Sequence, residues 1–405
     1  MAPSSKYVGS GSHPADPSDS EAGSVERTAA RGPWQVLKET SRSATPVIAP
    51  TSHGEIRENE GIRAEDVPRC PLCGGEGATV YRDLRDRHWA VHGAWSLRRC
   101  GACRFAWLNP RPLPEEMPNL YRGYFTHRAP PIQPRVEDEG ILRRWQRAVL
   151  SELGYEIGGQ PGVGGLADQA LRFLPWVREE YQRFVYYVPG PPRGTLLDVG
   201  CGDGAFLDRM HDLGWRVRGL EPDPEAAAVA RGRHGLDVTE GSIEDANLPP
   251  EAFHAITMNH VIEHVRDPVL ALMKCRRALE PDGILVLITP NIDSWGHRNF
   301  GQSWWGLDPP RHLYLFSRTT LLNALGAAGL TAQSTRTSAL RAYWYHRSSS
   351  AIRATGRADI SKGFSKLSFS DHAFRYAEYA MTHVRPDAGE ELVVVARNPQ
   401  GAKAR

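Results

Sequence analysis

Several features are scarce in this chain of 405 residues, and each absence narrows what the protein can be. No run of eighteen apolar residues occurs, which argues against a membrane-spanning helix. The N-terminal stretch MAPSSKYVGSGSHPADPSDSEAGS lacks the apolar core of a secretory signal. An excess of one charge is also missing, since 49 Lys and Arg face 47 Asp and Glu, and this argues against a protein built mainly to grip nucleic acid. We therefore expect a cytoplasmic protein without a membrane span.

Cysteine is scarce too, but four of the six cysteines form two CxxC pairs, Cys70/Cys73 and Cys100/Cys103. In a long chain without a signal sequence, paired CxxC motifs indicate metal ligation before disulfides. Each CxxC turn points two sulfurs at one place, and the neighbouring glycines relieve the tight backbone. Four thiolates leave no open position for water, so we predict a structural zinc ion, with iron or disulfides as the alternatives.

Composition divides the chain into four predicted parts. Residues 1–64 are rich in Ser, Pro, Gly, Ala and charge, and predict a disordered tail. Residues 65–125 combine turn residues with short aromatic and β-branched runs, which is typical of a small, zinc-ribbon-like β module. Residues 126–190 carry apolar side chains at helical spacing and predict a helical connector or lid. Residues 191–400 alternate between strand and helix patterns.

That alternation predicts an α/β fold with a Rossmann-like, doubly wound and mostly parallel sheet, covered on both faces. The predicted strands are TLLDVG, WRVRGLEP, FHAITMNHV and ILVLITPN. The helix before the last of them, DPVLALMKCRRALEPDG, is expected to be capped at Gly283. ELVVVARN near the end predicts an antiparallel final strand at the edge of the sheet, while the pattern does not place residues 339–384.

A glycine-rich segment, Asp198-Val-Gly200-Cys-Gly202-Asp-Gly204, follows the first strand and opens a helix. The glycines allow a sharp turn and let a bulky ligand approach the backbone. Glu221 ends the next strand, where a carboxylate can hydrogen-bond the ribose hydroxyls of an adenosine-containing cofactor. The segment therefore predicts a nucleotide-type cofactor site.

Two cofactor classes fit this loop. With Ala205 it satisfies the G-x-G-x-x-G/A pattern of dinucleotide-binding proteins, which leaves a nicotinamide-dependent oxidoreductase open. Asp198 favours the other class, because a carboxylate beside a pyrophosphate is repelled, whereas one beside a sulfonium or ammonium is attracted. S-adenosylmethionine carries both cations and no phosphate.

Four ordered segments, LLDVGCGDGAFL, GLEPDPEAAAVAR, GSIEDANLPPEAFHAITMNHVIEHVRDP and LEPDGILVLITPN, resemble class I S-adenosylmethionine-dependent methyltransferases. They are most similar to the subgroup of the ubiquinone-biosynthesis O-methyltransferases. The resemblance covers residues 195–329 strongly and the final strand loosely. It departs from the family at His254, where Asp is usual, and at Asp282, where Gly is usual. The resemblance implies methyl transfer with S-adenosylmethionine as cofactor. The fold by itself would not imply this activity, because one fold hosts many functions.

The resemblance also implies a set of site residues. The cofactor's methionine part would lie on Asp198, Gly200 and Gly202, its ribose on Glu221, its adenine near Ser242 and Ile243, and its sulfonium before Asn259 and His260, with Cys201 and Pro222 completing the set. An alcohol acceptor also benefits from a general base, most often His. We rank His312 in DPPRHLYLF first for this catalytic role and His260 second, while His264 is as readily a structural residue.

The cysteine segment carries a second resemblance. CPLCG…RCGACRFAWLNPRPLPEEMPNLYRGYF is similar to the N-terminal zinc-binding domain of bacterial sugar C-methyltransferases that act on nucleotide-linked deoxysugars. In that family the zinc domain helps to enclose the substrate, which implies that Tyr121, Tyr124 and Phe125 lie near the acceptor. Those enzymes have a further large C-terminal domain, for which the roughly 75 residues after Gly329 are too few.

Besides the nicotinamide-dependent oxidoreductase, three functions stay open at this point. The leading one is methyl transfer to a small-molecule or glycan (sugar) acceptor, at oxygen or at carbon of a keto-sugar. The second is an RNA methyltransferase that uses the zinc module on nucleic acid; against it, Asp308-Pro-Pro-Arg311 has Arg where base-methylating enzymes have an aromatic residue. The third is a non-catalytic cofactor-binding scaffold, against which the intact Asp198 and Glu221 argue. The acceptor and the oligomeric state are not predicted.

Overall fold

The computed structural model describes residues 55–121, 141–155, 175–190, 194–358 and 367–399, all within one compact unit, Ala44–Arg405. The predicted disordered tail lies outside the described residues up to position 54. The prediction of disorder is wrong for the last part of this tail, because β1 (Ile56–Asn59) and β2 (Ile62–Glu65) form an antiparallel hairpin. The hairpin was missed because its strands are only four residues long and β1 is largely exposed, so no apolar run marks it.

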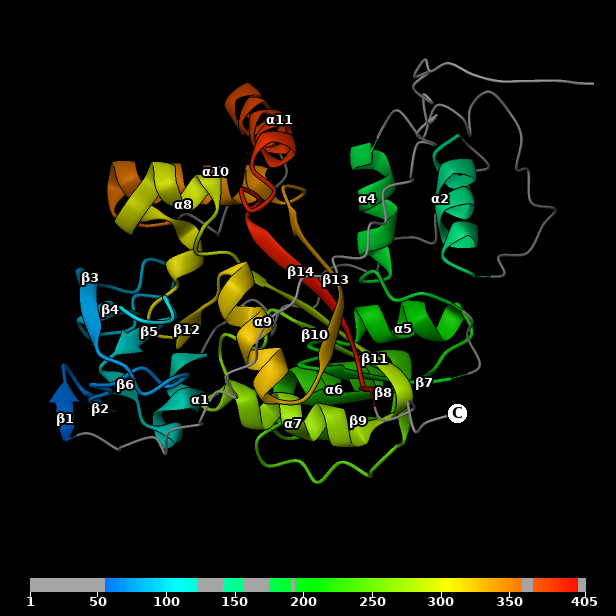
Figure 1. Cartoon of the computed structure of the whole chain (residues 1–405), viewed down its shortest axis with the longest axis horizontal. Coiled ribbons are helices and arrows are strands. Elements are labelled where there is room, and N and C mark those ends of the chain that lie inside the picture. The colour runs from blue at the N-terminus through cyan, green and yellow to red at the C-terminus, as the bar shows by residue number, and fades with distance from the viewer. Residues whose placement is uncertain (1–54, 122–140, 156–174, 191–193, 359–366, 400–405) are drawn as a thin grey trace, which may run out of the picture. The chain divides into compact units, whose positions relative to one another are not determined.

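The centre of the fold is a seven-stranded sheet in the order β13-β14-β11-β10-β7-β8-β9 (Figure 1). Five of its strands are parallel: β7 (Thr195–Val199), β8 (Arg216–Glu221), β9 (Val238–Glu240), β10 (Phe253–Asn259) and β11 (Leu279–Pro290). Strand β14 (Glu391–Arg397) runs antiparallel to β11. This confirms the Rossmann-like, mostly parallel sheet with an antiparallel final strand.

Two details of the sheet differ from the sequence prediction. Strand β14 is not the edge, because β13 (Thr331–Ser338) pairs with its outer side. The sequence of β13, TAQSTRTS, has no apolar run because most of the strand is partly exposed. The helix expected to end at Gly283 ends at Ala278, and buried Leu279 already pairs with Phe253 as the first residue of β11.

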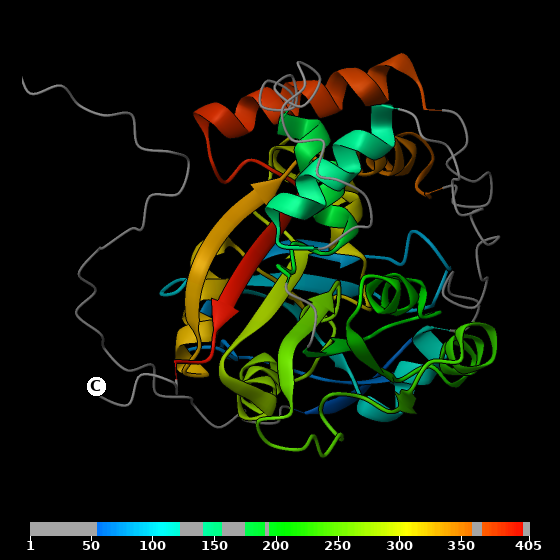
Figure 2. The ribbon, with the colours of Figure 1, turned by 90° about the vertical axis from the view of Figure 1, so that its right-hand side faces the viewer.

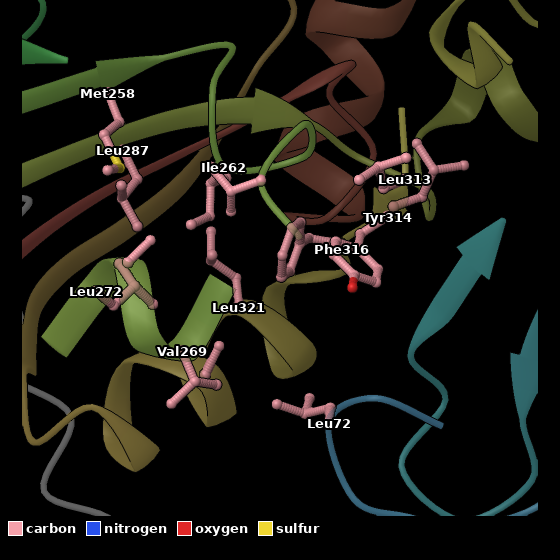
Figure 3. Close-up of a cluster of buried hydrophobic side chains, with 14 of the residues drawn as sticks. Leu72, Met258, Ile262, Val269, Leu272, Leu287, Leu313, Tyr314, Phe316 and Leu321 are labelled. Carbon is pink, nitrogen blue, oxygen red and sulfur yellow. The ribbon is translucent and has the colours of Figure 1, made fainter. Parts of the chain in front are cut away.

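Helices cover both faces of the sheet. Helices α5 (Ala205–Asp212) and α6 (Pro224–His234) pack on one face, and α7 (Pro268–Ala278) and α9 (Arg318–Ala327) on the other. Neighbouring strand residues therefore point into different cores: Leu196 and Val286 face α5 and α6, whereas Leu197 and Leu287 face α7 and α9. Figure 3 shows the second core around Met258, Leu272 and Leu321.

The cysteine segment forms a small β module. Its four-stranded sheet has the order β12-β5-β4-β3. A second sheet has the order β1-β2-β6, because β2 of the hairpin also pairs with β6. The strands are β3 (Gly77–Leu84), β4 (Trp95–Cys100), β5 (Ala106–Asn109), β6 (Arg111–Pro112) and β12 (Tyr314–Leu315), followed after β6 by a 3-10 turn and the short helix α1 (Met117–Leu120). This confirms the β-rich module. Strand β12 comes from the α/β part of the chain, and Leu72 and Phe316 share one core (Figure 3), so the two parts are not separate packing units.

Further helices gather where the parallel strands end (Figures 1 and 2). Helices α2 (Ile141–Glu152) and α4 (Pro175–Phe184) belong to the predicted connector, whose residues 156–174 lie outside the described part. Helix α8 (Trp295–Phe300) contacts α10 (Ala342–Thr355) and α11 (Phe369–Val384), which occupy much of the range that the sequence pattern did not place. Among the described helices, none has the length and apolarity to cross a bilayer.

Candidate functional site: a cofactor loop and a buried histidine cluster

The glycine loop between β7 and α5 is closed on one side and open on the other. Gly200 and Gly202 have φ angles of 72° and 56°, which other residues adopt only with strain. A Cβ at Gly200 would lie 2.5 Å from a methyl carbon of Val261. A Cβ at Gly202 would meet no described heavy atom within 4 Å. The loop therefore packs tightly against the protein and leaves its outer backbone free to approach a ligand.

Two carboxylates stand at the ends of the strands beside this loop. Asp198 is 3% exposed and accepts a hydrogen bond of 2.6 Å from Thr257 Oγ1. Burial raises the pKa of Asp198 to about 7, and the nearby charge of Glu221 acts in the same direction. Glu221 accepts hydrogen bonds from the backbone N–H of Gly202 at 2.7 Å and of Asp223 at 2.9 Å. A bound cation would stabilise the ionised form of Asp198, whereas a phosphate would oppose it.

The remaining predicted cofactor residues line the same edge in different ways. Cys201 is buried and its sulfur packs close to Gly219, so it can face a ligand only through its backbone. Pro222 is exposed beside Glu221. Ile243 is 2% exposed within the core, and Ser242 donates a hydrogen bond of 2.6 Å to Asp245. These positions do not conflict with a cofactor site, and the role of each residue in cofactor binding stays a prediction.

Asn259 ends β10, and His260 follows it directly in a network of charged side chains. His260 has a positive φ of 55° and lies between two buried carboxylates, with Nδ1 3.2 Å from Glu263 and Nε2 2.9 Å from Glu391. Burial alone would lower the pKa of His260, but Glu263 and Glu391 outweigh it and raise the pKa to about 9. His260 is therefore a cation at neutral pH, which disfavours it as a general base.

Three residues of this network were not identified from the sequence. Glu391 begins β14, more than a hundred residues after His260, and no local pattern links the two. Arg183 of α4 donates a hydrogen bond of 2.9 Å to Asn259 Oδ1. Tyr186 stacks on Phe206 with ring centroids 3.8 Å apart. For Arg183 and Tyr186 the only available signal was their proximity in sequence to the first strand.

Three side chains from distant segments meet in a second cluster. The hydroxyl of Tyr121, at the end of α1, lies 2.9 Å from Nδ1 of His264. The rings of His264 and His312 are 4.8 Å apart, edge to face. The pKa of His264 is lowered to about 4 by burial and by the neighbouring His312, so His264 is neutral. The geometry thus joins His312, the first-ranked catalytic residue, to Tyr121, while Tyr124 and Phe125 lie outside the described residues.

The second cluster offers nitrogen and oxygen atoms that can accept a proton or ligate a cation. Nδ1 of His312 is 2.8 Å from the carbonyl oxygen of Gly306, so this nitrogen carries a proton, and in the neutral ring the lone pair is on Nε2. Glu263 Oε2 accepts a hydrogen bond of 2.9 Å from Thr289. Ligand atoms of Glu263, His264 and His312 lie within 4.8 Å of one another, a spacing that could also hold a metal ion.

A buried arginine fastens the β module to this cluster. Arg311, with no exposed surface, donates two hydrogen bonds of 2.9 Å to Asp86, which follows β3. It also donates to Asp308 from Nε at 3.1 Å and from Nη2 at 2.5 Å. The module and the α/β sheet therefore meet around His312 and its neighbours.

The four predicted metal ligands converge in the module. The sulfurs of Cys70 and Cys103 are 3.5 Å apart, as are those of Cys73 and Cys100. A tetrahedral zinc with bonds of about 2.3 Å holds its sulfurs at a comparable spacing. Backbone bonds from Gly74 N to Cys70 O and from Arg104 N to Cys100 O close two matching turns. The cluster has the donor set and shape of a closed thiolate site.

A cavity of about 300 Å³ lies between α4 and α11, away from the glycine loop. Its aromatic lining includes Trp176, Tyr376 and Tyr379. None of the predicted site residues lines it, so we assign it no part in the chemistry.

Comparison with known proteins agrees with this geometry. Residues 173–335 match the family model of a methyltransferase domain. A protein of Mycolicibacterium smegmatis named "Probable S-adenosylmethionine-dependent methyltransferase" is 31% identical over 137 residues, 33% of this chain and 51% of the relative. A ubiquinone biosynthesis O-methyltransferase of Xanthomonas campestris is 38% identical over 131 residues, 31% of this chain and 53% of the relative. The chain thus spans about half the length of the curated relatives it matches.

Solved structures are more distant. A methyltransferase from Mesorhizobium loti, described as S-adenosylmethionine dependent, has 18% sequence identity and a TM-score of 0.38, and covers 54% of this chain and 97% of its own. At that TM-score the likeness adds nothing to the match of residues 173–335.

Proposed function

Because residues 173–335 match a methyltransferase domain, we propose that the chain is a class I S-adenosylmethionine-dependent methyltransferase that methylates a small-molecule or glycan (sugar) acceptor. Oxygen is the first candidate for the methylated atom, since several relatives are named O-methyltransferases. Carbon of a keto-sugar is the second, on the resemblance of the cysteine segment. The observation that carries the proposal is the pair of carboxylates, Asp198 and Glu221, beside a glycine loop with an open outer side.

The residues at the loop fit the chemistry of S-adenosylmethionine. When bound, this cofactor supplies a methyl group activated by a sulfonium. Asp198 would hold the ammonium of its methionine part, because a cation relieves the cost of ionising that buried carboxyl. Glu221 is fixed by two backbone N–H groups at the end of β8, and its carboxylate would accept hydrogen bonds from the ribose hydroxyls. Gly202 leaves room for the ligand.

His312 is our candidate for the general base. Its Nδ1–H is held by the carbonyl of Gly306, which fixes the ring and leaves Nε2 to accept a proton from an acceptor hydroxyl. Asp308 Oδ2 lies 4.0 Å from Nε2 and would stabilise the imidazolium that forms. Tyr121 and His264 stand beside it as neutral hydrogen-bonding groups for the acceptor. His260 is a cation held between Glu263 and Glu391, so we give it the role of fixing this end of β10 and not a contact with the sulfonium.

The four cysteines are proposed to hold one structural zinc ion. Their two matching turns present four sulfurs to one point, and the small module that they staple packs against the acceptor side through Arg311. Four thiolates complete a tetrahedral shell, so this ion would fix the module rather than take part in methyl transfer.

The experiment uses S-adenosylmethionine with a labelled methyl group, the purified full chain and a host extract split into small-molecule, glycan, protein and RNA fractions. Label in the small-molecule or glycan fraction is the expected result. Glu221→Gln should abolish most of the transfer, because it weakens the ribose contacts. Glu240→Gln is the matched control, since Glu240 ends the neighbouring strand β9 but lies exposed.

The other outcomes separate the alternatives. Label in RNA would replace this proposal by an RNA methyltransferase. Tight binding of S-adenosylmethionine without transfer to any fraction would favour a non-catalytic scaffold. Affinity for a nicotinamide dinucleotide, with none for S-adenosylmethionine, would overturn the proposal altogether.

A further inference from the structure

The cavity between α4 and α11 has aromatic walls that the proposed chemistry leaves unused (Figure 1). Its volume of about 300 Å³ lies within the range of sites for small ligands. Trp176 of α4 lines one side, and Tyr376 and Tyr379 of α11 line the other. The Trp176 ring meets these two rings at 83° and 87°, with centroids 6.3 and 6.2 Å away. The rings therefore form a corner, in which a ligand can contact more than one of them.

The charged residues of the lining favour a positively charged ligand. Helix α4 contributes two carboxylates, those of Glu179 and Glu180, whereas α11 contributes one guanidinium, that of Arg375. Burial raises the pKa of Glu179, and a cation beside this carboxyl would stabilise its ionised form. Glu180 lies exposed on the same helix. Carboxylates thus outnumber cations around the cavity.

The guanidinium of Arg375 is held by aromatic side chains of the protein itself. Its Cζ lies 4.9 Å from the ring centre of Tyr376 and 5.6 Å from that of Tyr343. Nη2 donates a hydrogen bond of 3.1 Å to the hydroxyl of Tyr376. Much of the remaining lining is apolar, from Val177, Ala339 and Leu340. Such a lining does not suit a small metal cation, which needs several oxygen ligands.

Aromatic rings beside carboxylates attract a large organic cation. The negative faces of the rings attract the charge, and the methyl groups of a quaternary ammonium contact the rings without giving up hydrogen bonds. We propose that this cavity binds a ligand that carries a quaternary ammonium group. The inference does not rest on the proposed function, because the cavity lies away from the glycine loop and none of the predicted site residues lines it.

The test compares choline with 3,3-dimethylbutan-1-ol, a neutral alcohol of nearly the same shape in which carbon replaces the ammonium nitrogen. Each is titrated into the full chain and followed by nuclear magnetic resonance of its methyl protons. Choline should bind roughly 5- to 30-fold more tightly, because only choline carries the charge that the rings attract. Trp176→Leu should remove most of this preference by weakening the binding of choline.

Two charge variants should have opposite effects. Glu180→Gln should weaken choline binding roughly two- to fivefold, since it removes an attracting carboxylate at an exposed position. Arg375→Gln should strengthen choline binding by a similar factor, since it removes a repelling charge. The affinity for the neutral alcohol should stay within about twofold in both variants. A purely structural effect of these substitutions would not change sign with the charge.

Trp295→Leu is the matched control. Trp295 stacks on Phe374 of α11, with ring centroids 4.7 Å apart, and neither residue lines the cavity. Its loss disturbs the packing of the same helix but should leave the preference for choline intact.

The contrary outcomes are distinct from those for the proposed function. Equal affinity of the wild-type chain for both ligands, or binding of neither, would overturn the assignment of the cavity. A preference that survives Trp176→Leu would place the choline site elsewhere and overturn it too. None of these results bears on methyl transfer, which its own labelling experiment decides.

Discussion

Replacing Arg311 by Met should destabilise the protein by about 3 kcal/mol at pH 7. The substitution keeps the length of the side chain but removes the cation shared by Asp86 and Asp308, both of which are buried. Breaking a buried ion pair by removing one partner costs roughly 3–5 kcal/mol, since it leaves an uncompensated charge. We expect the lower end, because Asp86 keeps three backbone N–H donors, those of His88, Trp89 and Val91.

The same change should alter the dependence of stability on pH. In the wild-type protein, burial alone would raise the pKa of Asp308, but Arg311 outweighs it and holds the pKa well below its ordinary 3.8. This contribution to stability is therefore present above about pH 4 and is lost only as the pH falls lower. Without Arg311, burial raises the pKa of Asp308, so the folded variant gains protons on mild acidification. The difference between wild type and variant should shrink from pH 7 to pH 5.

Urea unfolding at pH 7, 6 and 5, followed by tryptophan fluorescence, measures both effects. The control is Arg218→Met, which removes an exposed pair with Asp237 and should change stability by less than about 1 kcal/mol at every pH. A loss below about 1 kcal/mol for Arg311→Met, or a loss that does not vary with pH, would refute the reasoning.

Three further predictions follow from other sites. Cys100→Ser should lower the zinc content, measured by mass spectrometry of the metal, and reduce Tm; a full zinc content would contradict a four-thiolate site. Burial raises the pKa of Glu390 to about 7, and burial beside Glu390 raises that of Glu378, so the contribution of these two carboxyls to wild-type stability should fall as the pH rises from 4.5 towards 7. Glu378→Gln should then stabilise the protein by roughly 1–3 kcal/mol at pH 8 but not at pH 5 in urea unfolding, and equal effects at both would contradict the raised pKa of Glu378. His312→Ala should lower kcat roughly 100-fold and leave the Kd for S-adenosylhomocysteine unchanged; a parallel loss of affinity would place His312 in the cofactor site instead.

The parts of the fold that the sequence predicted have local signals. Strand β11 reads as an apolar run because both faces of a parallel strand are buried. The glycine loop is visible because positive φ angles at Gly200 and Gly202 demand glycine. The cysteine pairs are visible because metal ligation fixes their spacing. In each case the physical constraint acts on residues that are close in sequence, so a local sequence pattern is enough to predict the feature.

The parts that were missed depend on pairing between distant segments. Strand β13 carries polar residues because its exposed edge needs no apolar face, and β12 contributes only two residues to the module's sheet. Glu391 reaches His260 only because β14 inserts between β11 and β13. A carboxylate at the start of a strand looks the same in sequence whether it meets solvent or a buried histidine.

The site itself shows why the module and the sheet belong together. Tyr121 comes from the module and His264 from the loop after β10, and their hydrogen bond forms only when the module is docked. Buried ion pairs contribute little net stability compared with apolar packing, but they penalise every other arrangement in which a charge is left unpaired. Arg311 between Asp86 and Asp308 is such a pair, and it adjoins the histidine cluster. We infer that its contribution is to fix where Tyr121 stands, so that loosening this contact should reduce methyl transfer before it reduces cofactor binding.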